Sequence, residues 1–170
     1  MKAAAWILCG LLVVALLGLI GYLVWNDYVF GRDCAGYLKL AGDAPTIERA
    51  NEFLGKAVSY LARTGKTEGS SAIIFRTPKA DVGIWYGQIV AAKKNLAQLL
   101  EKGEAASQLE KDNSLMKIRE TVLDQGEAGT KVTSPPNISI YPRQRLLAVL
   151  LLLWLVAAGV NGILFWKVYD

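Results

Sequence analysis

Two long apolar segments, one near each end of the chain, constrain this sequence more than any other feature. Residues 3–25 and 146–166 contain no lysine, arginine, aspartate or glutamate. A helix rises ~1.5 Å per residue, so about 20 apolar residues cross a hydrocarbon layer of ~30 Å. The sequence therefore predicts two transmembrane helices, at 3–25 and 146–166, that enclose an extramembrane domain at 26–145.

The first segment is interpreted as an uncleaved signal anchor. Its apolar run is longer than the ~7–15 residues of a signal-peptide core, and no small-x-small pattern follows it before Asn26. Aromatic rings with a polar edge favour the headgroup layer, and such residues stand near the ends of both segments. They are Trp6, Tyr22, Trp25, Tyr28, Trp166 and Tyr169. These positions mark the expected membrane boundaries.

The charges that flank the two segments give opposing signals about orientation. Lys2 and the amino terminus favour a cytoplasmic start, whereas Arg143 and Arg145 favour a cytoplasmic insert. The insert is longer than the ~60 residues over which loop charge controls translocation. The working hypothesis is a two-span protein of a bacterial inner membrane, with both termini cytoplasmic and residues 26–145 outside.

Small and polar residues within the segments predict contacts between membrane helices. Gly18 and Gly21 are three residues apart, and Ala158 and Gly162 are four apart, so each pair opens one face of a helix to close approach. Asn161 is more informative, because a carboxamide in apolar sequence requires a hydrogen-bond partner. That partner is expected on the other span or on another protein.

Composition argues against several classes of function. The net charge is +4 and charges of both signs are interleaved in the insert, so we expect no nucleic-acid partner. The chain contains no histidine, which is the commonest general base and metal ligand. Its two cysteines, Cys9 and Cys34, do not form a metal or redox pair. We therefore expect no enzyme activity, no cofactor and no metal.

The tripeptide Gly65-Lys66-Thr67 matches the end of a phosphate-binding loop. The full motif requires a glycine five residues before Gly65, where Tyr60 stands, and the preceding sequence is helical in pattern. Gly65 is interpreted as a residue that ends a helix. The fragment does not support nucleotide binding.

The insert is expected to fold as a small helical bundle, so the fold class is mainly α. Apolar residues recur every three or four positions in three stretches, which is typical of amphipathic helices. The first begins at residues 43–45 and ends near Gly65, the second opens at 77–78, and the third spans 107–124. Residues 72–75 and 138–141 are candidates for a short two-stranded β element. Trp85 is assigned to the core, and its neighbour Tyr86 is a candidate partner contact.

These features favour a noncatalytic scaffold or accessory subunit of a larger membrane complex. Its partners would be the lipid bilayer and other integral membrane proteins or further copies of itself. One alternative is a ligand-sensing module, because a helical domain between two spans can transmit binding into the bilayer. A less favoured alternative is an oligomeric channel or transporter component, because only Asn161 is distinctly polar in the spans.

Overall fold

The computed structural model describes residues 2–126 and 129–169. These residues form a mainly helical protein with one small antiparallel sheet, and two apolar helices flank a helical core. The predicted fold class is therefore confirmed.

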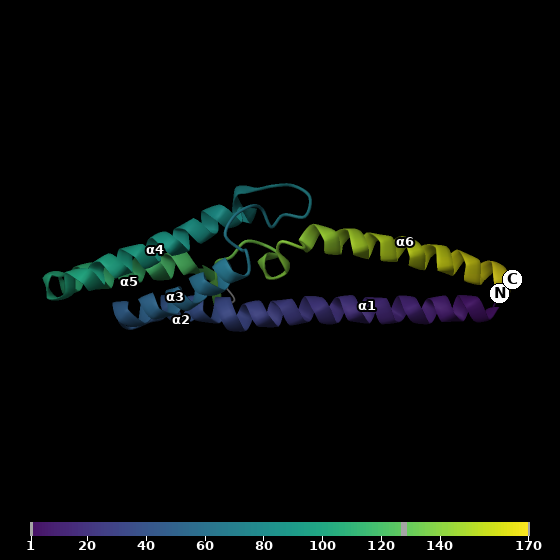
Figure 1. Ribbon diagram of the computed structural model, residues 1–170, viewed down its shortest axis with the longest axis horizontal. Coiled ribbons are helices and arrows are strands. Elements are labelled where there is room, and N and C mark those ends of the chain that lie inside the picture. The colour runs from purple at the N-terminus through teal and green to yellow at the C-terminus, as the bar shows by residue number, and fades with distance from the viewer. Residues whose placement is uncertain (1, 127–128, 170) are drawn as a thin grey trace.

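The first helical stretch runs far past the first apolar segment. Helix α1 (Lys2–Phe30) continues into a π-helical turn (Gly31–Ala35) and then into α2 (Gly36–Gly42). At the turn, the Gly36 N–H donates to the Gly31 carbonyl, so the helix widens without breaking. Helix α6 (Gln144–Tyr169) returns beside α1, and both termini lie at the same end of the molecule (Figure 1).

Two stretches of the described residues are long and apolar enough to cross a membrane. They lie within Trp6–Gly42 and Gln144–Ile163, and their most apolar 18-residue windows have mean hydropathies of 2.8 and 2.4. In the single chain, 0% and 11% of the residues in these windows are fully buried.

Helix α3 (Ile47–Arg63) begins a few residues later than the sequence predicts. The predicted start at residues 43–45 is too early, because the Asp43 N–H donates to the Lys39 carbonyl at 3.0 Å and so closes α2. Thr46 is the N-cap, and its side chain accepts a hydrogen bond from the Arg49 N–H. The chain leaves α3 near Gly65, as predicted, through a positive φ of 68° that glycine adopts freely.

Helices α4 (Val82–Lys102) and α5 (Gln108–Val122) form an antiparallel arm. A short 3-10 turn (Pro78–Ala80) precedes α4, and another (Gly103–Ala105) follows it. The side chain of Asp81 caps α4, and Ser107 with Glu110 forms a capping box at the start of α5. In Figure 1 the turn between α4 and α5 lies at the end of the molecule opposite both termini.

The sheet forms at a different place from the predicted one. Strands β1 (Leu123–Gly126) and β2 (Gly129–Val132) pair antiparallel, with Leu123 opposite Val132. The predicted pairing of residues 72–75 with 138–141 is wrong. Residues 138–141 contain a 3-10 turn (Ile138–Ile140). Residues 72–75 belong to a loop that is closed at its base by a hydrogen bond from the Ser71 N–H to the Ala80 carbonyl.

The core of the insert lies where α2, α3, α4 and α5 meet. The apolar positions that the sequence pattern selects on α3 and α4 face this core. The largest fully buried apolar side chains are Leu38, Leu54, Leu61, Val82, Ile89, Leu96 and Val122. Because α2 continues the α1 helix, this core is built directly onto the end of the first apolar helix.

Candidate functional site

Helices α1 and α6 contact one another along an antiparallel hairpin. Near the termini, the rings of Trp6 and Phe165 meet edge to face with centroids 5.2 Å apart. Further along, the indole of Trp154 donates to the Leu12 carbonyl at 2.8 Å. From the first of these contacts to the second, the residue number increases in α1 and decreases in α6, so the two helices are antiparallel.

The residues that line this contact recur at helical spacing on both helices. We call these positions the seam; the partly or fully buried ones include Cys9, Leu12, Leu16, Leu19, Leu23, Trp154, Ala157, Ala158, Asn161 and Phe165. Trp154 could face protein or lipid from its sequence position alone. Its indole N–H needs an acceptor in an apolar setting, and the Leu12 carbonyl supplies one.

The predicted small-residue positions do not all lie on this seam. Ala158 is half-buried, whereas Gly18, Gly21 and Gly162 are exposed. A methyl group added at any of these three glycines would meet nothing within 4 Å. Their role in helix contact therefore stays a prediction, and in this structure only a second protein chain could provide that contact.

Asn161 lies on the face of α6 that carries Trp154 and Phe165, because these positions are seven and four residues from it. Its side chain is only 7% exposed. The Oδ1 atom is buried without a hydrogen-bond partner among the described residues. A buried amide oxygen without a donor is costly, so Asn161 is a polar position that the described part of the hairpin leaves unsatisfied.

A second polar site lies where α3 ends. Lys66 is 4% exposed, and its ammonium group donates to the carbonyls of Ile138 at 2.8 Å, Ser139 at 3.3 Å and Tyr141. Burial lowers the pKa of this lysine to about 8, with a further contribution from nearby Arg143. The lysine of the Gly65-Lys66-Thr67 fragment thus binds the protein's own backbone.

Cys34 lies close enough to Lys66 for the charge of the ammonium group to influence the thiol. It stands past the apolar part of α1, after the exposed charged residues Asp27 and Arg32, and it is fully buried in the core of the insert. Burial raises the pKa of the thiol to about 12, and the positive charge of Lys66 offsets this only in part. Cys34 is therefore a protonated, shielded thiol at neutral pH.

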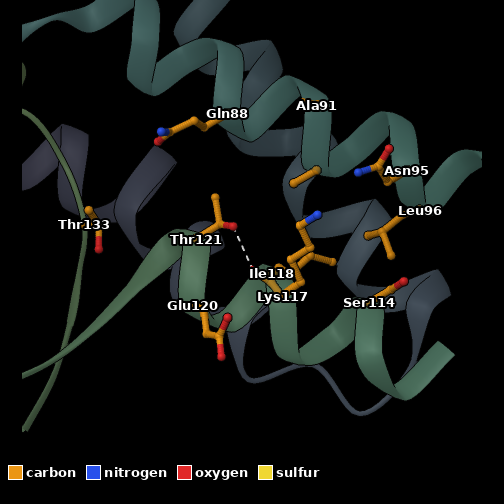
Figure 2. Close-up of a pocket in the computed structure, with 11 residues that line it drawn as sticks. Gln88, Ala91, Asn95, Leu96, Ser114, Lys117, Ile118, Glu120, Thr121 and Thr133 are labelled. Atoms are coloured by element: carbon orange, nitrogen blue, oxygen red, sulfur yellow. Dashed lines mark hydrogen bonds between the residues drawn. The ribbon is translucent and has the colours of Figure 1, made fainter. Parts of the chain in front are cut away.

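A groove runs between α4 and α5, with a volume of about 460 Å³ (Figure 2). In Figure 2, Gln88, Ala91 and Asn95 line it from α4, and Ser114 and Lys117 line it from α5. The wall mixes amides, hydroxyl groups and charged groups with apolar side chains such as Leu96 and Ile118. The volume lies within the range of small-molecule sites, ~300–1,000 Å³.

The two neighbouring aromatic residues of α4 take different positions. Trp85 is buried, as predicted, and its indole donates to the Thr133 carbonyl at 2.7 Å. Tyr86 is half-buried and packs against the core at its edge. Its role as a partner contact stays a prediction.

Among the residues that the structure describes, no group of three or more His, Cys, Asp or Glu side chains could hold a metal ion. Comparisons with protein-family models, curated proteins and solved structures found no match for this chain. Function must therefore be inferred from the residues and their geometry.

Proposed function

We propose that this chain is a noncatalytic integral-membrane scaffold or accessory subunit. The α1–α6 hairpin anchors it in the bilayer and contacts other membrane proteins or a second copy of the chain, and the helical insert contacts a further component. The observation that carries this proposal is the antiparallel hairpin with an apolar outer surface, joined through one continuous helix to the insert.

The outer surface of the hairpin is too apolar to face water. Leu11, Val14 and Leu17 on α1 are each more than 60% exposed, and Leu152 on α6 is 60% exposed. Contiguous apolar surface of this kind is typical of membrane or protein contact. The exposed Gly18 and Gly21 lie beside these residues and leave room for a further helix to approach closely.

Photo-crosslinking in the native membrane tests this proposal. A photoreactive residue at Leu17, on the outer surface, is expected to capture another integral membrane protein or a second copy of the chain. The same residue at Leu16, in the seam, is expected to capture only α6 of its own chain.

Photo-phenylalanine at half-buried Tyr86 is expected to capture a partner of the insert, and the same residue at buried Tyr60 serves as the control. Lipid adducts alone at position 17, with no protein captured at position 86, would contradict the scaffold.

We further propose that both termini are cytoplasmic and that residues 26–145 lie outside, in a bacterial inner membrane. Lys2 before the first apolar helix supports this orientation. A membrane-impermeant thiol reagent tests it at Gln108→Cys, an exposed position near the far end of the insert. Labelling in intact cells supports the orientation, and labelling only after permeabilisation contradicts it. Cys34 cannot report topology, because it is fully buried.

The groove between α4 and α5 favours a second candidate function, a ligand-sensing module. Its volume and mixed lining suit a small polar molecule. Thermal-shift screening of the full chain in detergent, with Ala91→Trp as a variant that fills the groove, separates the two functions. A ligand that stabilises the native chain but not the variant supports sensing.

A further inference from the structure

An exposed loop with an apolar tip lies beside the start of α6, between α3 and α4. Its stem is closed by the Ser71 N–H, which donates to the Ala80 carbonyl at 2.9 Å, and by the bridge between Ser70 and Asp81. Ser71, Ala72 and Ala80 are buried, whereas all residues from 73 to 79 are exposed. The stem is therefore part of the folded core and the tip projects from it.

The tip carries large apolar side chains that no part of the described chain covers. Ile73, Ile74 and Phe75 are consecutive and are 41%, 75% and 83% exposed. Phe75 is more exposed than the large apolar side chains that the structure describes on α1 and α6, and it stands on a surface loop. Three consecutive exposed apolar side chains on one loop tip indicate contact with a membrane or with another protein.

The loop is tied to the first turn of α6 by two side chains. The buried Gln144 amide donates to the Ser70 carbonyl at 3.0 Å, and the Arg145 guanidinium donates to the Ala72 carbonyl at 3.4 Å. The apolar segment of α6 begins at the next residue, Leu146. Figure 1 shows the loop extending over the start of α6, in the direction of the two termini. The tip is therefore level with the point where α6 enters its apolar segment.

Other residues at this level have the chemistry of a membrane boundary. Trp25 on α1 is 64% exposed, and Arg143, just before α6, donates to the Tyr22 hydroxyl at 3.1 Å. Exposed tryptophan and tyrosine at the end of an apolar helix favour the headgroup layer. Trp6 and Trp25 are about 19 residues apart, so they are separated by ~28 Å, close to the thickness of the hydrocarbon layer.

Cationic side chains surround the apolar tip. Arg76 and Lys79 follow it within the loop, and Arg143 and Arg145 flank its stem, and all four are exposed. Apolar residues bordered by lysine and arginine are the pattern of segments that lie in the interface of an anionic bilayer. Each cation near such a surface adds attraction to the anionic headgroups.

We propose that the tip, Ile73–Ile74–Phe75, inserts into the interfacial layer of the same bilayer that holds the hairpin, as a third membrane contact. This inference rests on the proposed membrane anchoring of α1 and α6. Arg76 and Lys79 bind anionic headgroups beside it, and the ties to Gln144 and Arg145 hold it at the correct depth. The contact fixes the tilt of the insert, because the loop joins α3 and α4 directly.

An environment-sensitive fluorophore tests the position of the tip. The full chain, carrying Cys9→Ala and one new cysteine labelled with nitrobenzoxadiazole, is reconstituted in vesicles of phosphatidylcholine and phosphatidylglycerol. The acyl chains are brominated near the headgroup or, in a second preparation, near the middle of the bilayer. The buried Cys34 thiol does not react in the folded protein. The label at Phe75→Cys is expected to shift to the blue and to lose about half of its emission to bromine.

Two matched positions make the result specific. Leu109 on α5 is also an exposed apolar residue, at 69%, but it lies at the far end of the arm, so a label at Leu109→Cys is expected to stay in water. A label at Leu17→Cys, inside the first apolar helix, reports through the deep bromine whether the hairpin is in the bilayer at all. Bromine quenching at 17 but not at 75 overturns this inference and leaves the membrane anchor intact. No quenching at either position refutes the anchor itself.

The cationic residues are tested in the same assay. Arg76→Glu combined with Lys79→Glu is expected to reduce quenching at position 75 in vesicles that contain phosphatidylglycerol and to change it little in pure phosphatidylcholine. A blue shift at position 75 without bromine quenching would mean that the tip is covered by protein, in a second copy of the chain, and would overturn the proposal.

Discussion

At the scale of single residues, Cys34 and Lys66 show how burial changes chemistry in this protein. The thiol is fully buried in the insert core, and its pKa rises to about 12. The ammonium beside it is nearly as buried, but three backbone carbonyls accept its hydrogen bonds. Its charge therefore has partners, whereas a thiolate at Cys34 would have to form inside the core.

Cys34 makes stability depend on pH above about 9. In the unfolded chain the thiol ionises near its ordinary pKa of 9.0, whereas in the folded protein it stays protonated up to about 12. The folded state therefore binds more protons in this range, so the contribution of Cys34 is complete below pH 9 and falls as the pH rises toward 12. Between these two pH values, the contribution of Cys34 to the free energy of unfolding falls by at most about 1.4 kcal/mol per pH unit.

Denaturant unfolding of the full chain in detergent, at several values between pH 8 and pH 10.5, measures this effect. The Cys34→Ala variant carries the same other titrating groups, so the difference in unfolding free energy between the two proteins isolates the thiol. That difference is expected to shrink as the pH rises. A constant difference across the range would mean that the thiol titrates alike in both states, and Cys34 would not be buried as described.

At the scale of elements, Lys66 joins the end of α3 to the turn at Ile138–Ile140 that precedes α6. Lys66→Met keeps the length of the side chain but removes the donor for three carbonyls. The loss of these hydrogen bonds is expected to destabilise the insert by about 1–3 kcal/mol. Lys94→Met, at an exposed position of α4, is the matched control and is expected to change stability little. Thermal unfolding in detergent compares the two, and equal effects would contradict the role of Lys66.

The sequence pattern predicts the helices well, because their signals are local. The apolar stripe of α4 identifies Trp85 as core, and Gly65 follows the end of α3 as expected. The sheet could not be predicted in the same way. Leu123 continues the apolar pattern of α5, and it becomes a strand only because Val132 lies opposite it.

Long-range contacts explain what sequence reasoning missed at the candidate site. Trp154 was ambiguous from its position, since its acceptor, the Leu12 carbonyl, is a backbone group on the other apolar helix. The seam residues have the same apolar character as the outer surface, so spacing alone does not separate them. Small-residue spacing selected Gly18 and Gly21, which face outward, whereas the polarity of its side chain selected Asn161, which is buried. The buried Lys66 gave no sequence signal beyond a false resemblance to a phosphate-binding loop.

At the scale of the whole molecule, a single helical path connects the apolar helix to the core of the insert. Helix α1, the π-helical turn and α2 run without a break from Lys2 to Gly42, and α3 and α5 pack on α2. We therefore expect a change in the tilt of α1 to move the insert with it. This connection suits either proposed role, because it would hold the proposed contacts at the hairpin and at the α4–α5 arm in a fixed relation.

Gly31→Pro tests the connection at the π-helical turn. Proline removes a backbone donor and clashes with the preceding turn, at a cost of about 3 kcal/mol in a helix interior, so it is expected to kink or break the path. Gly31→Ala is the matched control, since a methyl group there meets nothing within 4 Å and alanine favours the helix.

Spin labels at the exposed positions Val13 and Gln98, in a Cys9→Ala background, report the distance between α1 and the arm. A narrow distance distribution is expected for the native sequence and for Gly31→Ala, and a broad or shifted one for Gly31→Pro. If the native distribution is already broad, the apolar helix and the insert move independently, and the continuous helix does not couple them.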